Sequence, residues 1–107
     1  MYQTIKKQIR PSLEIPFFRP RSENSPLSQE VRDYIDSNYL ATGKQLFSEQ
    51  TVSDNGLELT TIVIWDSMES EQEFFQDPVV IENFVNVRAA YFAANGITTE
   101  AIEQGNI

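Results

Sequence analysis

The side chains that could do chemistry in this chain are carboxylates, lysines, arginines and tyrosines, because the chain contains neither Cys nor His. Without Cys, disulfides, thiolate nucleophiles and cysteine-ligated metals are excluded. Without His, the chain lacks the usual general base at neutral pH and the commonest protein ligand of metals and haem. The sequence therefore predicts no metal site and no bound cofactor, and it assigns no catalytic residue.

Arg88 is the best candidate for holding a ligand, because it lies among apolar residues that recur at helical spacing from Val80 to Phe92. Facing a cavity, its guanidinium would bind a carboxylate or a phenolate. Paired with Asp66 or Glu82, it would instead be structural. Large aromatic residues lie in the same part of the chain, and each is either a pocket wall or a core residue. The predicted ligand pocket consists of Trp65, Phe74, Phe84, Arg88 and Tyr91.

The acidic residues and the glycines carry less information about chemistry. Glu69, Glu71 and Glu73 do not share one helix face, and we expect them to be solvated. Asp33 and Asp36 are three residues apart, but two carboxylates without further ligands bind a divalent ion weakly. The four glycines are isolated from one another, so the chain has no glycine-rich phosphate-binding loop.

The net charge of −8 disfavours nucleic acid and anionic membranes as partners, because both are negatively charged. Five of the eight basic residues nevertheless lie between Lys6 and Arg21. This basic segment is either a solvated edge beside an acidic body or a rim around an anionic ligand. No segment approaches the ~20 apolar residues of a membrane span, and residues 1–10 lack the apolar core of a signal peptide. We therefore expect a cytoplasmic protein.

The length favours a single domain over residues 1–107, whose strands and helices must position these side chains. Residues 2–9 alternate loosely and the pattern resumes over 13–15, which favours an edge strand because Pro11 cannot donate to a ladder. Residues 19–24 form a predicted loop. Ser25-Pro26 suits a helix start, with Ser25 as N-cap, and this helix is expected to end at residues 41–43.

A β-hairpin is the clearest local feature of the sequence. Residues 44–53 and 57–65 are joined by Asp54-Asn55-Gly56, which supplies the positive φ angles of a tight turn. In its second strand Leu57, Leu59, Thr61, Val63 and Trp65 fall on one face, and Ile62 and Ile64 fall on the other. Ser67 caps a short helix, Asp77-Pro78 begins a longer one that ends at Asn95-Gly96, and a short final strand follows from Ile97.

The predicted order β-α-β-β-α-β is the split βαβ pattern of an α+β, ferredoxin-like fold. Its helices cover one face of the sheet only. Apolar residues on the other face favour a homodimer in which two sheets pack together. The alternative is a monomeric ferredoxin-like domain with a polar open face, against which Ile62 and Ile64 argue.

The segment Ile62-Val63-Ile64-Trp65-Asp66-Ser67, followed by an acidic short helix and Asp77-Pro78, resembles the antibiotic-biosynthesis monooxygenase-like family. The resemblance extends through Val79, Glu82, Asn83 and Val87-Arg88 and covers residues 57–90. It implies a dimeric α+β barrel, in which two ferredoxin-like sheets pack face to face.

The haem-degrading branch of that family is most similar to this segment, but two of its three functional positions are absent. A His of that branch ligates the iron, and alignment from Trp65 places Phe84 at that position. A first-strand Asn of the branch has no counterpart in residues 2–18, whereas Phe74 keeps the aromatic character of a third position. Because haem ligation would then need Tyr or Met, the resemblance does not imply haem degradation.

Two functions remain open at this stage. The first is a non-catalytic or small-molecule-binding homodimer that has lost the family chemistry, which the missing His and Asn favour. The alternative is a cofactor-independent monooxygenase acting on an aromatic or anionic small molecule, which the resemblance implies. Such an enzyme needs a cavity and groups that stabilise a substrate anion, and the candidates around Trp65 are Arg88, Tyr34, Tyr39 and Tyr91.

Overall fold

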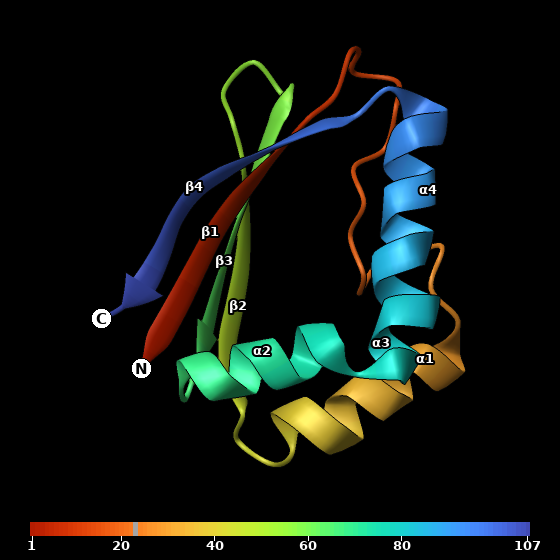
Figure 1. Cartoon of the computed structure of the whole chain (residues 1–107). Coiled ribbons are helices and arrows are strands. Elements are labelled where there is room, and N and C mark those ends of the chain that lie inside the picture. The colour runs from red at the N-terminus through yellow and green to blue at the C-terminus, as the bar shows by residue number, and fades with distance from the viewer. Residues whose placement is uncertain (23) are drawn as a thin grey trace.

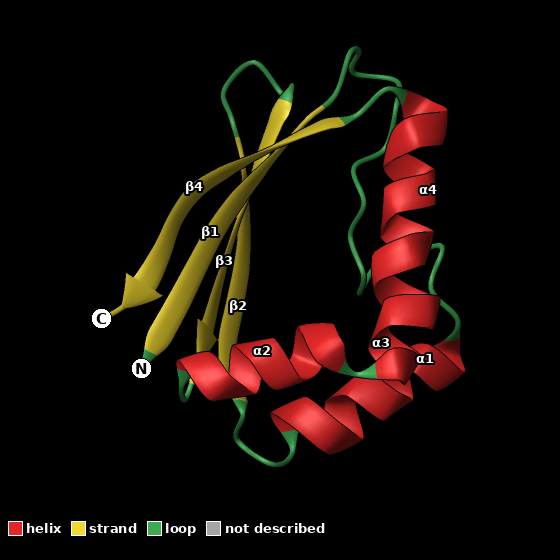
Figure 2. Cartoon of the chain, viewed as in Figure 1, coloured by secondary structure: helices red, strands yellow, loops and turns green. Residues whose placement is uncertain are grey.

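The computed structural model describes residues 1–22 and 24–107 and shows one sheet covered by helices on one side (Figures 1 and 2). The strands are β1 (Tyr2–Ile9), β2 (Gln45–Val52), β3 (Glu58–Trp65) and β4 (Thr98–Asn106). The helices are α1 (Gln29–Ile35), α2 (Met68–Gln76), α3 (Pro78–Val80) and α4 (Asn86–Asn95). Two π-helical segments continue them: η1 (Asp36–Leu40) follows α1, and η2 (Ile81–Val85) joins α3 to α4.

The four strands form an antiparallel sheet in the order β2-β3-β1-β4. This order confirms the predicted α+β, ferredoxin-like fold. The prediction of an edge strand at the N-terminus is wrong, because β1 lies between β3 and β4. Pro11 does not interrupt the ladder, since the strand already ends at Ile9, and residues 13–15 form a turn rather than a strand.

Alternation along the strands gives the sheet two different faces. The face toward the helices carries the fully buried Leu59 and Trp65 of β3, together with Thr4 and Gln8 of β1. Ile5 and Ile62 pair with each other, and each lies an odd number of residues along its strand from these buried residues. Both isoleucines therefore lie on the opposite face. The predicted division of the second hairpin strand between two faces is therefore confirmed.

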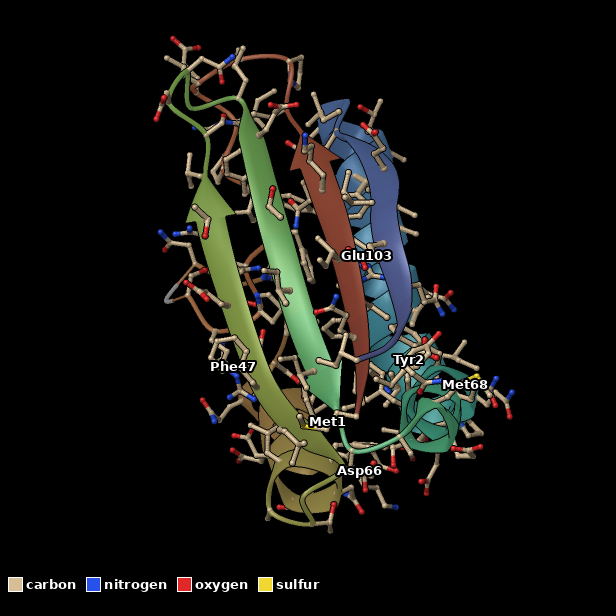
Figure 3. All side chains as sticks on the ribbon, turned by 90° about the vertical axis from the view of Figure 1, so that its left-hand side faces the viewer. Met1, Tyr2, Phe47, Asp66, Met68 and Glu103 are labelled. Carbon is tan, nitrogen blue, oxygen red and sulfur yellow. The ribbon has the colours of Figure 1, made fainter. Side chains whose placement is uncertain are left out.

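The open face combines apolar and acidic side chains and is turned toward the viewer in Figure 3. Its register places Phe47 opposite Ile64, and Glu49 opposite Ile62. The apolar part consists of Ile5, Ile9, Phe47, Ile62 and Ile64. The acidic part consists of Glu49, Glu58, Glu100 and Glu103, of which Glu58 forms an ion pair with Lys7 at 3.3 Å.

The last strand is longer than the short strand expected from Ile97 onward. β4 pairs with the whole of β1, and the backbone N–H of Ile107 donates to the carbonyl of Met1 at 2.9 Å. A β-bulge lies in this pairing, because Ile5 faces Glu103 whereas Lys6 faces Ala101. The extra residue, Ile102, lets Glu100 and Glu103 point to the same face although they are three residues apart.

The first helix begins later than predicted. The Ser28 hydroxyl accepts from the backbone N–H of Val31 and caps α1, whereas the Ser25 hydroxyl accepts from Leu27 and forms a turn. Both serines are good caps, and the one followed by an uninterrupted helical segment becomes the N-cap. The loop predicted over residues 19–24 contains Glu23, which lies outside the described residues.

The second half of the chain folds locally as predicted. Ser67 caps α2 by accepting from Ser70, and Asp77 caps α3 by accepting from Val79, with Pro78 as the first helical residue. Gly96 ends α4 with a φ of 65°, a left-handed conformation that glycine adopts without strain. α4 runs alongside the sheet, while α1 and α2 cross one end of it (Figure 1). None of the described helices is both long enough and apolar enough to span a bilayer.

Candidate functional site

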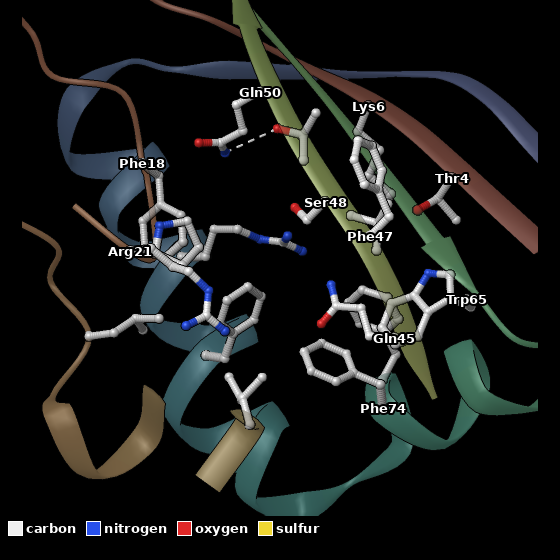
Figure 4. A pocket seen from close by; sticks show the side chains of 18 of the residues that line it. Thr4, Lys6, Phe18, Arg21, Gln45, Phe47, Ser48, Gln50, Trp65 and Phe74 are labelled. Carbon is white, nitrogen blue, oxygen red and sulfur yellow. Dashed lines mark hydrogen bonds between the residues drawn. The ribbon is translucent and has the colours of Figure 1, made fainter. Parts of the chain in front are cut away.

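A cavity of about 590 Å³ lies between the helix-facing side of the sheet and the helices (Figure 4). Three strands contribute to its lining: β1 through Thr4 and Lys6, β2 through Ser48 and Gln50, and β3 through Trp65. Its other walls come from the segment before α1, from α1 itself, and from α2, η2 and α4. A cavity of this size suits a drug-sized organic molecule.

One wall of the cavity is an aromatic cluster built around Phe74. The Phe74 ring packs 5.2 Å from that of Trp65, 5.0 Å from that of Phe75 and 5.7 Å from that of Phe84, measured between ring centroids. Trp65 and Phe74 are almost fully buried. The indole N–H of Trp65 is buried and has no acceptor among the described residues. This wall offers ring faces and edges to an aromatic or apolar ligand.

The opposite wall is Phe18, which comes from the segment between β1 and α1. Gln8 holds this segment against the sheet: its side-chain amide donates to the carbonyl of Phe18 at 2.8 Å, and its side-chain oxygen accepts from the N–H of Phe18 at 2.9 Å. The Phe18 ring is 1% exposed and packs against Phe84 and Phe92. The pair of hydrogen bonds therefore positions a cavity wall.

Basic side chains project into this aromatic cavity. Lys6 of β1 and Arg88 of α4 line it, and so do Lys7, Arg21 and Arg32. No Asp or Glu of the described chain contributes to the lining, although the whole protein carries a charge of −8. The cavity is thus a positively charged site in an acidic protein, which favours an anionic ligand.

Lys6 and Arg88 form no ion pair with any described residue. Arg32 forms none either, but its guanidinium donates to the side-chain oxygen of Gln29 at 3.0 Å. Arg21, by contrast, is paired with Asp36. The guanidinium of Arg88 lies 5.2 Å from the Phe84 ring centroid, and Nζ of Lys6 lies 4.9 Å from that of Phe75. Burial lowers the pKa of Arg88. Burial also lowers the pKa of Lys6, and the positive charge of Arg88 lowers it further.

Four of the five residues predicted to form the pocket line this cavity: Trp65, Phe74, Phe84 and Arg88. Arg88 is paired with neither Asp66 nor Glu82 in the structure. Tyr91 is not among the lining residues of the described chain, and its hydroxyl donates to the carbonyl of Pro16 at 2.6 Å. Tyr91 therefore supports the segment that carries Phe18 rather than facing the ligand space.

The tyrosines of α1 and η1 also lie outside the cavity. The hydroxyls of Tyr34 and Tyr39 donate to the same oxygen of Asp77, at 2.7 and 2.6 Å. Burial of Asp77 favours its neutral form, but the hydrogen bonds from Tyr39 and Tyr34, and from the backbone of Val79 and Val80, outweigh this effect and lower its pKa. This cluster joins two helical segments and is structural.

The expectation that all three glutamates of α2 are solvated is wrong for Glu71, which is 9% exposed. Burial raises its pKa, and the charge of Lys6 partly opposes that effect. The spacing of the glutamates did not indicate this, because spacing along one helix does not show which other parts of the chain pack against it. Within the described part of the chain, no group of three or more Asp and Glu residues could hold a metal ion.

Sequence reasoning missed Lys6, Gln8 and Phe18 as site residues. Lys6 and Gln8 lie in the segment that the sequence predicts as an edge strand, and Phe18 follows that segment. The signal that could have found them was the concentration of basic residues there, one interpretation of which was a rim around an anionic ligand. Lys6 fits that interpretation, and it lies inside the cavity.

Comparison with solved structures identifies two proteins of the same fold. One is a dimeric ferredoxin-like protein from an uncultured marine organism, with a TM-score of 0.64 and 11% identity over 99% of this chain and 87% of the other. The second is a putative antibiotic biosynthesis monooxygenase from Deinococcus radiodurans, with a TM-score of 0.51 and 10% identity over 100% and 95% of the two chains. The likeness is one of fold. At the level of the fold, the similarity to these two structures confirms the resemblance predicted from residues 57–90.

Neither a family model nor a curated protein matches the sequence.

Proposed function

We propose that this protein binds an organic anion with an aromatic or apolar body in the cavity between its sheet and its helices. The observation that carries the proposal is the combination of an aromatic lining with two cations, Lys6 and Arg88, that form no ion pair with a described residue. An unpaired, partly buried cation costs free energy, because burial removes its hydration. A carboxylate or phenolate bound between these two cations would replace that hydration with charge-assisted hydrogen bonds.

The test is calorimetric titration with a charged and a neutral ligand of nearly the same shape, for example 2-naphthoate and 2-naphthamide. The naphthoate is expected to bind at least about tenfold more tightly, since a hydrogen bond to a charged group contributes about 1.5–3 kcal/mol. Arg88→Gln should remove most of this difference. Lys44→Gln makes the same change in net charge outside the cavity lining and should leave it intact. Equal affinity for the two ligands would refute anion binding.

We propose further that the protein is a homodimer formed through the open sheet face. The apolar residues Ile5, Ile9, Phe47, Ile62 and Ile64 support this, because no helix of the described chain covers that face. The marine protein of the same fold is described as dimeric, which adds support. Two sheets packed in this way would leave both cavities on the outer sides of the dimer, each beside its own helices.

Native mass spectrometry tests the dimer. Ile62→Glu places a charge in the middle of the proposed interface and is expected to give a monomer. Val79→Glu makes the same chemical change at an exposed position on the helical side and should leave the dimer intact. A wild-type protein that is monomeric at micromolar concentration would contradict the proposal. The cytoplasmic location expected from the composition remains a prediction.

A cofactor-independent monooxygenase is the second candidate. In such a reaction one atom of O₂ enters the substrate, the other leaves as water, and the substrate supplies the electrons. Lys6 and Arg88 would stabilise the phenolate or enolate that reacts with O₂. The Deinococcus radiodurans protein of the same fold is described as a putative monooxygenase, which favours this candidate. Oxygen uptake with a dihydroxynaphthalene that is abolished by Arg88→Gln would support it, and uptake no faster than without protein would exclude that substrate.

A further inference from the structure

Lys6 differs from the other lysines of this protein in its surroundings. The chain has three lysines, and two of them form ion pairs: Lys7 with Glu58 at 3.3 Å, and Lys44 with Glu73 at 2.8 Å. Lys6 has no ion pair with a described residue, faces the cavity, and lies over the Phe75 ring. An ion pair with a carboxylate stabilises the ammonium form, which has no lone pair and is not a nucleophile, and Lys6 has no such ion pair with a described residue.

Two features of the cavity favour the neutral amine of Lys6, which is the nucleophilic form. Burial removes hydration from the ammonium, and Arg88 adds a second positive charge nearby, so that both lower the pKa of Lys6. A desolvated lysine beside another cation is a recurring arrangement for lysines that form imines with carbonyl compounds. The charge of Glu71 acts in the opposite direction and raises the pKa of Lys6, but burial is the largest of the three effects, and the pKa is lowered overall.

We propose that Lys6 forms an imine with an aromatic 2-oxo acid whose carboxylate is held by Arg88. The inference rests on the proposed binding of an organic anion and names the ligand class for the same cavity. The ring of the ligand would lie against Phe74 and Trp65, its carboxylate on the guanidinium, and its ketone carbon near Nζ of Lys6. The proposal thus assigns separate roles to the aromatic wall and to each of the two cations.

The reaction needs no oxidant, reductant or metal. The nitrogen lone pair of the neutral amine adds to the ketone carbon, and the carbon–oxygen π pair moves to the oxygen, which takes a proton to give a carbinolamine. Loss of the hydroxyl group, protonated to water, then leaves the imine. One amine and one ketone are consumed, and one imine and one water are formed. The proton released from nitrogen reaches the departing oxygen through water.

Borohydride trapping tests the proposal on the intact protein. Phenylpyruvate is incubated with the protein and sodium cyanoborohydride, and the product is digested and mapped by fragment-ion mass spectrometry. The expected adduct has the mass of the 2-oxo acid less one water plus two hydrogens, and it lies on Lys6. Lys7, Lys44 and the N-terminal amine are internal controls in the same sample. Equal labelling of these amines would overturn the proposal.

Variants at three positions, together with a second probe, separate the roles of the residues. Lys6→Arg should lose the adduct, and Lys6→Met gives the same test if the first variant does not fold. Lys44→Arg should keep it. Arg88→Met should lower the trapped fraction from phenylpyruvate by about tenfold or more and have little effect on trapping of phenylacetaldehyde, which has no carboxylate. Similar losses for both probes would show that Arg88 does not hold the carboxylate and would overturn the assignment.

Quenching of Trp65, the one tryptophan, reports binding independently of the covalent step. Saturable quenching by phenylpyruvate without an adduct on Lys6 would overturn imine formation while leaving anion binding in place. Absence of both quenching and adduct with phenylpyruvate would overturn the imine proposal. In that case the naphthoate titration decides separately whether the cavity binds organic anions at all.

Discussion

Replacement of Gln8 by Leu is expected to lower the free energy of unfolding by about 3 kcal/mol. Gln8 is 8% exposed and makes two hydrogen bonds to the backbone of Phe18, which is 1% exposed. Leu has a similar volume but no polar atoms, so the N–H and the carbonyl of Phe18 would lose their partners. Each unsatisfied buried group costs about 1–3 kcal/mol, and burial of a more apolar side chain returns about 1 kcal/mol.

Urea denaturation at one fixed protein concentration measures this loss, because a dimer would make stability depend on concentration. Gln50→Leu is the matched control. Its side chain makes one hydrogen bond, to the hydroxyl of Thr61 at 3.2 Å near the edge of the sheet, where water can replace it. The control should cost less than about 1 kcal/mol. A loss that is no larger for Gln8→Leu than for the control would refute the view that Gln8 positions the Phe18 wall.

Three further predictions concern charged groups. Asp77→Asn should lower stability by about 2 kcal/mol near neutral pH, because Asp77 caps α3 and accepts from two tyrosines. The folded state lowers the pKa of Asp77, so this contribution is present above the usual Asp pKa of about 3.9 and is lost as the pH falls through the lowered pKa. The free energies of unfolding of wild type and variant should therefore converge in acid. Lys6→Met should raise the free energy of unfolding by about 1 kcal/mol in urea titrations. The reason is that it removes a partly buried cation that has no ion pair with a described residue and whose pKa the charge of Arg88 lowers. A loss of stability would show that Lys6 has a partner in the cavity. The dimer should become tighter at high ionic strength in sedimentation experiments. The acidic residues of the open face repel their copies in the partner, and salt screens this repulsion. A dimer weakened by salt would indicate pairing of opposite charges instead.

Local signals in the sequence were sufficient for the hairpin and for the second half of the chain. Ser67, Asp77 and Gly96 occupy the cap positions predicted for them, because capping depends on one side chain and the backbone next to it. The division of the strand that ends in Trp65 between two faces could also be predicted from alternation alone.

The N-terminal third could not be predicted in the same way, because its structure depends on distant residues. Tyr2–Ile9 becomes a central strand only through pairing with β4, which lies at the other end of the chain. Arg10, next to the disruptive Pro11, is fixed by donating to the carbonyls of Gly56 and Ile15 at 2.8 Å. No local pattern predicts such contacts.

The candidate site, too, could be predicted only where local signals in the sequence were sufficient. Trp65, Phe74, Phe84 and Arg88 could be proposed because they share the region of the family resemblance, and the structure brings them to one cavity. Lys6 required knowledge that β1 is central and that its even-numbered residues face the helices. Tyr91 lies three residues after Arg88, but its hydroxyl reaches Pro16, which helical spacing alone could not indicate.

The alternation of β1 restricts how this protein can change over evolutionary time. Lys6 faces the cavity, while its neighbour Ile5 faces the proposed partner. Substitutions at odd and even positions can therefore adjust association and ligand choice independently. Loss or gain of one residue within the strand would exchange the two sets, placing Ile5 in the cavity and Lys6 outside. We therefore expect homologues to vary in residue type along this segment but to keep its length.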